Sequence, residues 1–239
     1  MKYDNSNFIR LELLREMKSG EFAESHRLPR ELELAKRFNI SRSQLREVLA
    51  QLEREGFITR LHGVGTLINR HVLQVKNRMD IEVEFMDMIR QNGYVPDVSA
   101  VSVKEELADT YIAEKLQIPE GSEVIRVCRI CTADGKPAIY CEDVLAKSLI
   151  KGEYSIKDLE PPIFYFLKKF CYIESYMDLT QLHAVAASET VADALQLPVG
   201  TPLLNMEEVD YDISGNIVFY SSEYFMDEYF EQTVLRKKL

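Results

Sequence analysis

The stretch from residue 28 to residue 67, LPRELELAKRFNISRSQLREVLAQLEREGFITRLHGVGTL, constrains the fold most, because two helix patterns and a hairpin pattern follow one another within it. Apolar residues at helical spacing predict a first helix that stops at Asn39, a residue that tolerates the left-handed conformation. Ser41 with Gln44 three residues later is the N-cap signal of a second helix, which Gly56 ends. The short connection between the two helices predicts a helix-turn-helix.

A hairpin pattern follows the second helix. The alternating run FITRLHGVGTLIN predicts two short strands around His62-Gly63-Val64-Gly65, where glycines permit a tight turn. The whole stretch therefore predicts a winged helix-turn-helix, which is a DNA-reading motif. The alternative is that its arginines form an ordinary solvated helix face. The coincidence of turn length, N-cap, glycine stop and glycine-rich wing favours the motif.

The start of the second helix carries the side chains that a recognition helix needs. In a helix-turn-helix, the N-terminal part of this helix meets the base edges in the major groove. Arginine can bind guanine with two hydrogen bonds, glutamine can read adenine, and serine can bind a phosphate or a base. The candidate residues are Ser41, Arg42, Ser43, Gln44 and Arg46.

This N-terminal stretch resembles the DNA-binding domain of the GntR family of bacterial transcription regulators. The resemblance implies DNA contacts by Ser41, Arg42 and Arg46 on the recognition helix. It also implies contacts by His62 and Gly63 at the wing, which reaches the minor groove in relatives. Relatives often carry arginine where this chain has Leu32, and Arg30 just upstream is the expected substitute.

The charge of the chain is divided unevenly. The 239 residues have a net charge of −10, but residues 1–70 hold 13 Lys and Arg against 10 Asp and Glu. The basic excess therefore lies with the helix-turn-helix, as phosphate contact requires, and the acidic remainder argues against nucleic-acid binding by the second half. No long apolar run predicts a membrane span, and the N-terminus lacks a signal-peptide core, so we expect a cytoplasmic protein.

The cysteines and histidines predict no metal site and no cofactor. Cys128 and Cys131 form a Cys-x-x-Cys pattern, but it lies in a strand-like run in which positions three apart face opposite sides. No second such pair and no nearby histidine complete a zinc set, so we expect buried, reduced thiols.

An internal repeat organises the second half. The segment AEKLQIPEG at 113–121 is echoed by ADALQLPVG at 192–200, and each copy precedes two strand patterns joined by a turn. The repeat predicts a mainly antiparallel sheet with helices against one face. Near the N-terminus, Phe8, Leu11, Leu14 and Met17 share the face on which a first helix is expected to pack.

Residues from about 90 to 235 resemble the UTRA effector domain of the HutC subfamily of GntR regulators. The resemblance rests on RICTADGKPA at 129–138, on Glu142, and on the ending SSEYFMDEYF. It implies a chorismate lyase-like fold that binds a small ligand and dimerises. The expected fold class is α+β, with a winged helix-turn-helix over 1–70, a linker and connecting helix over 71–90, and an effector-binding and dimerisation domain over 91–239.

The repeated strands supply the candidate effector pocket. Its polar candidates are Arg129, Tyr140, Glu142, Glu223 and Tyr224, of which Arg129 and Glu142 fall on ligand positions of the family. The alternative is a cross-strand salt bridge between Arg129 and Glu142. Relatives that bind sugar phosphates tend to have Arg-x-Arg and Ser-Leu-Tyr where this chain has Arg129-Ile-Cys131 and Pro162-Ile163-Phe164. We therefore expect a ligand less anionic than a phosphosugar, with apolar bulk suited to Phe164, Tyr165 and Phe166.

These features predict a transcription regulator, with repression as the commoner outcome in such families, whose operator binding changes when a small molecule binds the second domain. A homodimer would present two recognition helices to an inverted repeat of double-stranded DNA. The alternative is a lyase-like enzyme domain with a DNA-binding head. No Ser/His/Asp set, metal cluster or phosphate loop supports catalysis in the sequence, so we expect no enzyme.

Overall fold

The computed structural model describes residues 5–238, which divide into two compact units. Unit 1 extends to Glu82 and takes up the chain again from Gln232, and unit 2 runs from Val83 to Glu231. The chain therefore passes between the units twice. The expected linker, residues 71–90, spans the first of these passages, and the helix expected at its end begins at Phe85.

Unit 1 is the winged helix-turn-helix. Its elements are α1 (Asn5–Ser19), α2 (Glu31–Arg37), α3 (Arg42–Arg54), β1 (Ile58–Leu61), β2 (Gly65–Ile68), α4 (Arg70–Leu73), β3 (Asn77–Arg78) and β10 (Gln232–Thr233). Asn39 is left-handed with φ of 50°, and Gly56 follows α3 with φ of 82°, as the sequence predicts. The core joins α1, α2 and α3 through Leu13, Leu34 and Leu49.

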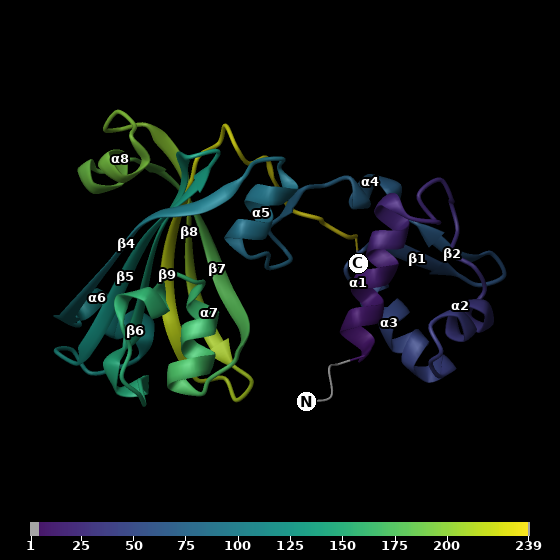
Figure 1. The fold of residues 1–239 in the computed structure, drawn as a ribbon, viewed down its shortest axis with the longest axis horizontal. Coiled ribbons are helices and arrows are strands. Elements are labelled where there is room, and N and C mark those ends of the chain that lie inside the picture. The colour runs from purple at the N-terminus through teal and green to yellow at the C-terminus, as the bar shows by residue number, and fades with distance from the viewer. Residues whose placement is uncertain (1–4, 239) are drawn as a thin grey trace. The chain divides into compact units, whose positions relative to one another are not determined.

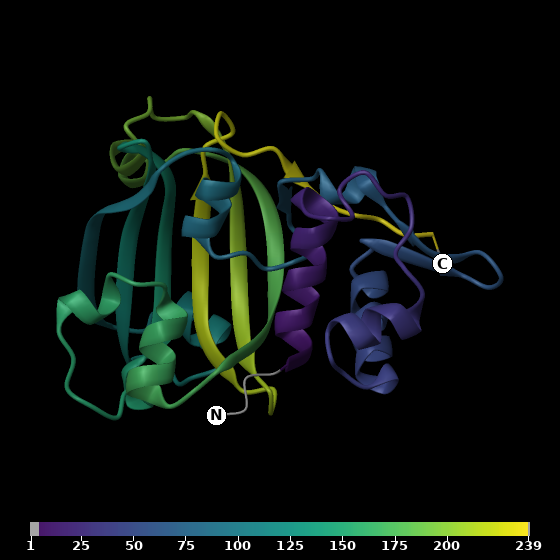
Figure 2. The same ribbon diagram turned by 45° about the vertical axis from the view of Figure 1, so that its right-hand side comes forward.

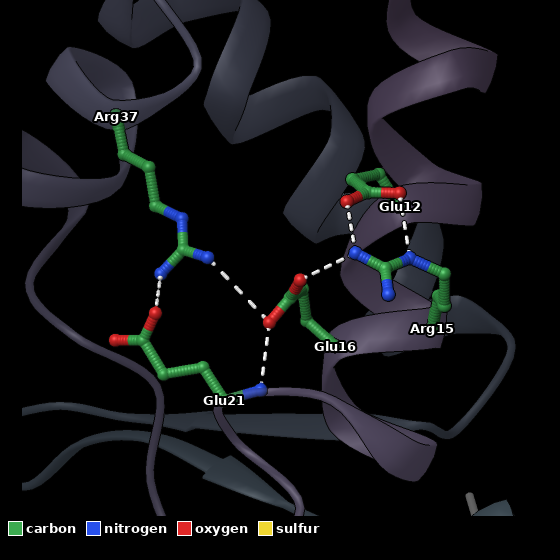
Figure 3. Close-up of polar contacts among 5 residues, drawn as sticks. All are labelled: Glu12, Arg15, Glu16, Glu21 and Arg37. Atoms are coloured by element: carbon green, nitrogen blue, oxygen red, sulfur yellow. Dashed lines mark hydrogen bonds and ion pairs between the residues drawn. The ribbon is translucent and has the colours of Figure 1, made fainter.

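The buried face of helix α1 matches the predicted one only in part: Met17 is buried and Leu14 packs against the unit 1 core, as predicted. Ile9, Leu13 and Met17 are buried, whereas Phe8 and Leu11, predicted to pack inward, are exposed. The buried set also includes the carboxylate of Glu16 (Figure 3). Glu16 accepts hydrogen bonds from Arg15 Nη2 at 2.6 Å and from the Glu21 backbone N–H at 2.8 Å, and it pairs with Arg37 at 3.5 Å. This network ties α1 to the following turn and to α2.

Unit 2 is built on one six-stranded antiparallel sheet in the order β4-β5-β6-β9-β8-β7 (Figure 1). Its elements are α5 (Phe85–Gln91), β4 (Pro96–Leu107), α6 (Thr110–Leu116), β5 (Glu123–Ala133), β6 (Lys136–Ala146), η1 (Lys147–Leu149), η2 (Ile156–Leu159), α7 (Ile163–Phe166), the π-helical turn η3 (Leu167–Cys171), β7 (Ser175–Ala186), α8 (Glu189–Leu195), β8 (Pro202–Asp212) and β9 (Ile217–Phe225).

The predicted repeat is present as two copies of strand, helix and hairpin, which meet where β6 pairs with β9. Helix α6 begins at an Asp109 cap and α8 at a Ser188 cap. Each helix ends on a left-handed glutamine, Gln117 or Gln196. The same local chemistry therefore produces the same turn in both copies.

Helices cover both faces of the sheet, not one face as expected. Helices α6 and α8 pack on the face that carries Val144 and Tyr140, which we call the α6/α8 face. Helix α7 packs on the opposite face, which carries Val127 and Leu145 and which we call the α7 face. Figure 2 shows α5 in front of the sheet on the same side as α7, and Phe85 of α5 contacts Phe225 edge-on. Helix α7, which lies between the two repeat copies in the sequence, therefore covers the α7 face.

The C-terminal segment completes unit 1. Strand β10 pairs in parallel with β3, Leu235 packs against the unit 1 core, and Lys237 Nζ donates to the carbonyls of Glu53 and Arg54 at 2.6 and 2.8 Å. The sequence places residues 91–239 in one effector domain, whereas the segment from Gln232 groups with unit 1. Its contacts lie at the C-terminal end of α3, far away in sequence.

Candidate DNA-binding and effector sites

The first turn of α3 presents polar side chains to solvent. Ser41 caps the helix by accepting from the Gln44 backbone N–H at 3.2 Å, and its hydroxyl lies 3.0 Å from that of Ser43. Arg42 is exposed and has no hydrogen-bond or ion-pair partner among the described residues. The cap therefore fixes the start of the helix while leaving a cation available for DNA.

Arg46 lies one turn further along α3 and is held by α2. Its Nε donates to Glu31 Oε2 at 2.8 Å, and its side chain is 59% exposed. An exposed pair of this kind contributes little to stability, so a base or phosphate can replace the carboxylate. Arg30, at the start of α2, is also exposed.

The wing is the hairpin of β1 and β2. His62 and Gly63 lie in its exposed turn, which the Val64 N–H closes on the Leu61 carbonyl at 3.1 Å. Gly63 and Gly65 have φ of 74° and 108°, and a Cβ at either would meet no atom within 4 Å. Glycine is thus required by the backbone conformation of the wing, and the space around the turn is open.

Arg129 is a buried cation on the α7 face. Its side chain is 5% exposed, Nε donates to the Leu159 carbonyl at 2.9 Å, and Nη1 donates to the carboxylate of Asp143. Nη2 is buried and has no hydrogen-bond partner among the described residues. Asp143 was not among the predicted site residues.

Glu223 lies on the same face, beyond the strand that carries Cys141. The register aligns Arg129, Cys141 and Glu223 on β5, β6 and β9. Glu223 is 7% exposed, and Ser221 Oγ donates to it at 3.2 Å. Burial, reinforced by Glu208, the Cys141 thiol and Asp143, raises the pKa of Glu223 well above its ordinary value.

The other three effector candidates face the opposite side of the sheet. Glu142 accepts from Arg126 Nη1 at 2.9 Å and from the Tyr140 hydroxyl at 2.8 Å. Tyr140 in turn stacks on Tyr224. The expectation of one pocket containing all five candidates is therefore wrong, and so is the alternative of a salt bridge between Arg129 and Glu142. Adjacent strand residues point to opposite faces, so Glu142 cannot join Cys141 beside Arg129.

The aromatic helix contributes only partly to the α7 face. Phe164 contacts Phe219 with ring centroids 5.9 Å apart, and Phe166 is buried against Tyr154. Tyr165, expected to contact ligand bulk, is 66% exposed. Phe164 and Phe166 thus pack with the apolar residues of the α7 face, whereas Tyr165 does not.

The four cysteines are free thiols. Cys131 and Cys141 are buried on the α7 face, Cys171 is also buried, and Cys128 is half-buried on the α6/α8 face. Within residues 5–238, no cluster of three or more His, Cys, Asp and Glu side chains could hold a metal ion. No helix in the same range is long and apolar enough to cross a membrane.

Two supporting residues of the DNA-binding unit were not predicted. Glu31 holds Arg46, and Arg27 Nη1 donates to the wing carbonyl of Val64 at 3.2 Å. Glu31 is recognisable in the sequence as an acidic residue of the first turn of α2, but its contact with Arg46 is not. Their roles follow from contacts between elements.

Comparison with known proteins agrees with this architecture. Residues 5–68 match the gntR family of bacterial regulatory proteins, and residues 91–231 match the UTRA domain. The chain is similar to the probable fructoselysine utilization operon transcriptional repressor of Escherichia coli K12, with 23% identity over 89% of this chain and 86% of that protein. It is also similar to the histidine utilization repressor of Pseudomonas putida, with 26% identity over 80% of this chain and 76% of that protein.

The fold is also that of a solved structure. The possible transcriptional regulator YydK of Bacillus subtilis has a TM-score of 0.75 and 21% identity, and the match covers 98% of this chain and 99% of that one. The chain belongs to the GntR family of bacterial regulators, in the HutC subfamily that carries a UTRA domain. It is a DNA-binding transcription regulator whose operator binding is modulated by a small-molecule effector.

Proposed function

We propose that this protein is a homodimeric repressor that binds an inverted-repeat operator and releases it when an effector occupies the α7 face of unit 2. The free Arg42 guanidinium at the start of α3 is the observation that carries the DNA-binding assignment. Repression is supported by relatives that are named repressors. Access to operator DNA would place the protein in the cytoplasm.

In this proposal the first turn of α3 enters the major groove. Ser41, Ser43 and Gln44 contact phosphates or base edges beside Arg42 and Arg46, and His62 and Gly63 bring the wing to the minor groove. Arg30, exposed before α2, contacts the backbone of the DNA. The open space around the wing glycines supports a close approach to the duplex.

Strand β7 supports the homodimer. It is an edge strand of the sheet and exposes four large apolar side chains: Tyr176 (64%), Met177 (51%), Leu179 (66%) and Leu182 (50%). An unprotected, apolar edge of this length is normally covered in a soluble protein, and a second copy can pair with it. Two copies would supply the two recognition helices that an inverted repeat requires.

The effector site of the proposal lies around Arg129 and Glu223. Both are buried polar groups on the face that α7 covers, and Arg129 Nη2 has no partner in the described chain. A catalytic role is the less supported alternative, because the matched relatives are regulators. Turnover of a bound effector by the purified protein would support the catalytic alternative.

Arg42→Ala tests the DNA-binding assignment. An operator would be selected from random DNA with the wild-type protein, and affinities measured by fluorescence anisotropy at fixed salt. Loss of a base-contacting arginine should weaken specific binding by about 1–3 kcal/mol. Arg54→Ala is the matched control, because Arg54 is an exposed arginine in the last turn of the same helix. Equal operator affinities for wild type and Arg42→Ala would refute this reading of α3.

A further inference from the structure

The α7 face carries more negative than positive side chains near Arg129. One row across the sheet reads Arg129, Cys141, Glu223 and Met206 on β5, β6, β9 and β8. The adjacent row reads Val127, Asp143, Ser221 and Glu208. One guanidinium therefore stands against three carboxylates in these two rows.

The guanidinium of Arg129 already forms an ion pair with one of the three carboxylates. Asp143 pairs with Arg129, and both side chains are 5% exposed. Glu223 forms no ion pair among the described residues and receives only the Ser221 hydroxyl at its side chain. A buried carboxylate without a cation is costly, so the folded protein keeps Glu223 protonated or needs a positive partner for it. Its raised pKa reflects the same deficit.

Arg129 offers the complementary group. Its Nη2 is buried, while Nε and Nη1 are engaged by the Leu159 carbonyl and Asp143. A buried N–H without an acceptor costs free energy that an oxygen atom of a ligand would recover. The site thus contains one unfilled donor and one carboxylate without a cation.

One strand separates Arg129 from Glu223. Arg129 and Glu223 lie on strands separated by β6 alone, so their backbones are about 10 Å apart. A ligand between the two side chains would lie over Cys141. A phosphate there would find three acidic side chains, Asp143, Glu208 and Glu223, and a single guanidinium that Asp143 already engages, so the site lacks the free cation that a phosphate needs.

We propose that the effector of this protein carries an ammonium group that binds Glu223 and an oxygen acceptor that binds Arg129 Nη2, as in a zwitterion or an amino sugar. This inference rests on the proposed function, because it names the ligand class of that same site. When the ligand binds, its ammonium group would form an ion pair with the buried carboxylate of Glu223. The ion pair between Arg129 and Asp143 would stay in place.

Pairs of compounds that differ only in an amino group test the contribution of the ammonium group to binding. The sugar set is glucose, glucosamine, glucose 6-phosphate and glucosamine 6-phosphate, and the linear set is hexanoate and 6-aminohexanoate. Binding to the full-length protein would be measured by thermal shift and calorimetry at neutral pH. Each set would be repeated with Glu223→Gln and with Glu142→Gln, whose altered carboxylate lies on the α6/α8 face. Operator binding by each variant reports that it is folded.

The ammonium compound of at least one pair should bind the wild type about tenfold or more tightly than its partner without the amine, because a charge-assisted hydrogen bond in a buried site is strong. Glu223→Gln should abolish that preference and Glu142→Gln should keep it. A preference that survives Glu223→Gln would overturn the proposal. So would the absence of any ammonium-dependent binding in both sets. If a neutral or phosphorylated compound instead binds and releases the operator, the proposed function stands and the ligand class fails.

Discussion

At the scale of single residues, the sequence predicts the backbone features that depend on a few neighbouring residues. Ser41 caps α3, Asn39 takes the left-handed turn, and the wing glycines have positive φ, because each depends on neighbours a few positions away. We expected Glu142 in one pocket with Arg129, but the two side chains lie on opposite faces of the sheet. A shift of one residue along a strand reverses the direction of a side chain. The partner of Arg129 is Asp143, one position further on.

Glu223 should make stability fall as pH rises. Its pKa is raised in the folded state, so the folded protein holds a proton that the unfolded chain has already released. The favourable contribution is full below the ordinary glutamate pKa and is lost as pH rises through the raised one. Glu223→Gln should remove this slope and, at pH 8, stabilise the ligand-free protein by about 1–3 kcal/mol.

Urea unfolding followed by circular dichroism between pH 5 and pH 8 measures this effect. Glu142→Gln provides the comparison, because it removes a carboxylate that accepts from Arg126 and Tyr140 and should not stabilise the protein. Parallel pH profiles for wild type and Glu223→Gln would show that Glu223 does not titrate as described.

At the scale of elements, the repeat is the strongest prediction from sequence. A side-chain oxygen caps the start of both α6 and α8, a left-handed glutamine ends each helix, and the strands follow at matching offsets. The placement of α7 could not be predicted in this way, because an aromatic helix can pack on either face of a sheet. The buried face of helix α1 was predicted only in part for a related reason: it includes the polar Glu16, which an apolar pattern ignores.

The C-terminal segment should stabilise the end of the recognition helix. Leu235 contacts the core over Gly56, and Lys237 donates to the last carbonyls of α3. Leu235→Ala should destabilise unit 1 by about 1–3 kcal/mol. Lys237→Ala should cost about 0.3–1 kcal/mol, because it removes a cation from a helix C-terminus.

Hydrogen exchange over residues 42–56, read by mass spectrometry, measures both effects. The matched control is Arg236→Ala, since Arg236 is exposed and has no partner among the described residues. Unchanged protection of α3 in Leu235→Ala would mean that the tail does not support the helix.

At the scale of the whole molecule, two covalent connections join the sensing and DNA-binding units. The chain leaves unit 1 after Glu82 and returns to it at Gln232, shortly after β9, the strand that carries Glu223. A change at the α7 face therefore has a short path along the chain to the segment that contacts the end of α3. Ligand binding that favours one arrangement of the two units would shift the population that fits the operator.

Dimerisation also belongs to this scale. Leu179→Lys places a charge on the exposed edge strand β7 and should weaken self-association, since lysine on a sheet edge opposes pairing. Sedimentation velocity across a concentration series gives the dimer fraction. Lys151→Ala serves as the control, because Lys151 is exposed outside the strands of the sheet. A dimer of undiminished strength in Leu179→Lys would exclude this edge as the interface.

The most direct measurement is an operator-binding titration by fluorescence anisotropy, with and without the ammonium compound that stabilises the protein most. The compound should weaken operator binding by wild type about tenfold or more, within the usual range of allosteric coupling. Glu223→Gln should bind the operator normally and respond little to the compound. Release of the operator to the same extent in Glu223→Gln, or no release from wild type, would contradict an effector site on the α7 face.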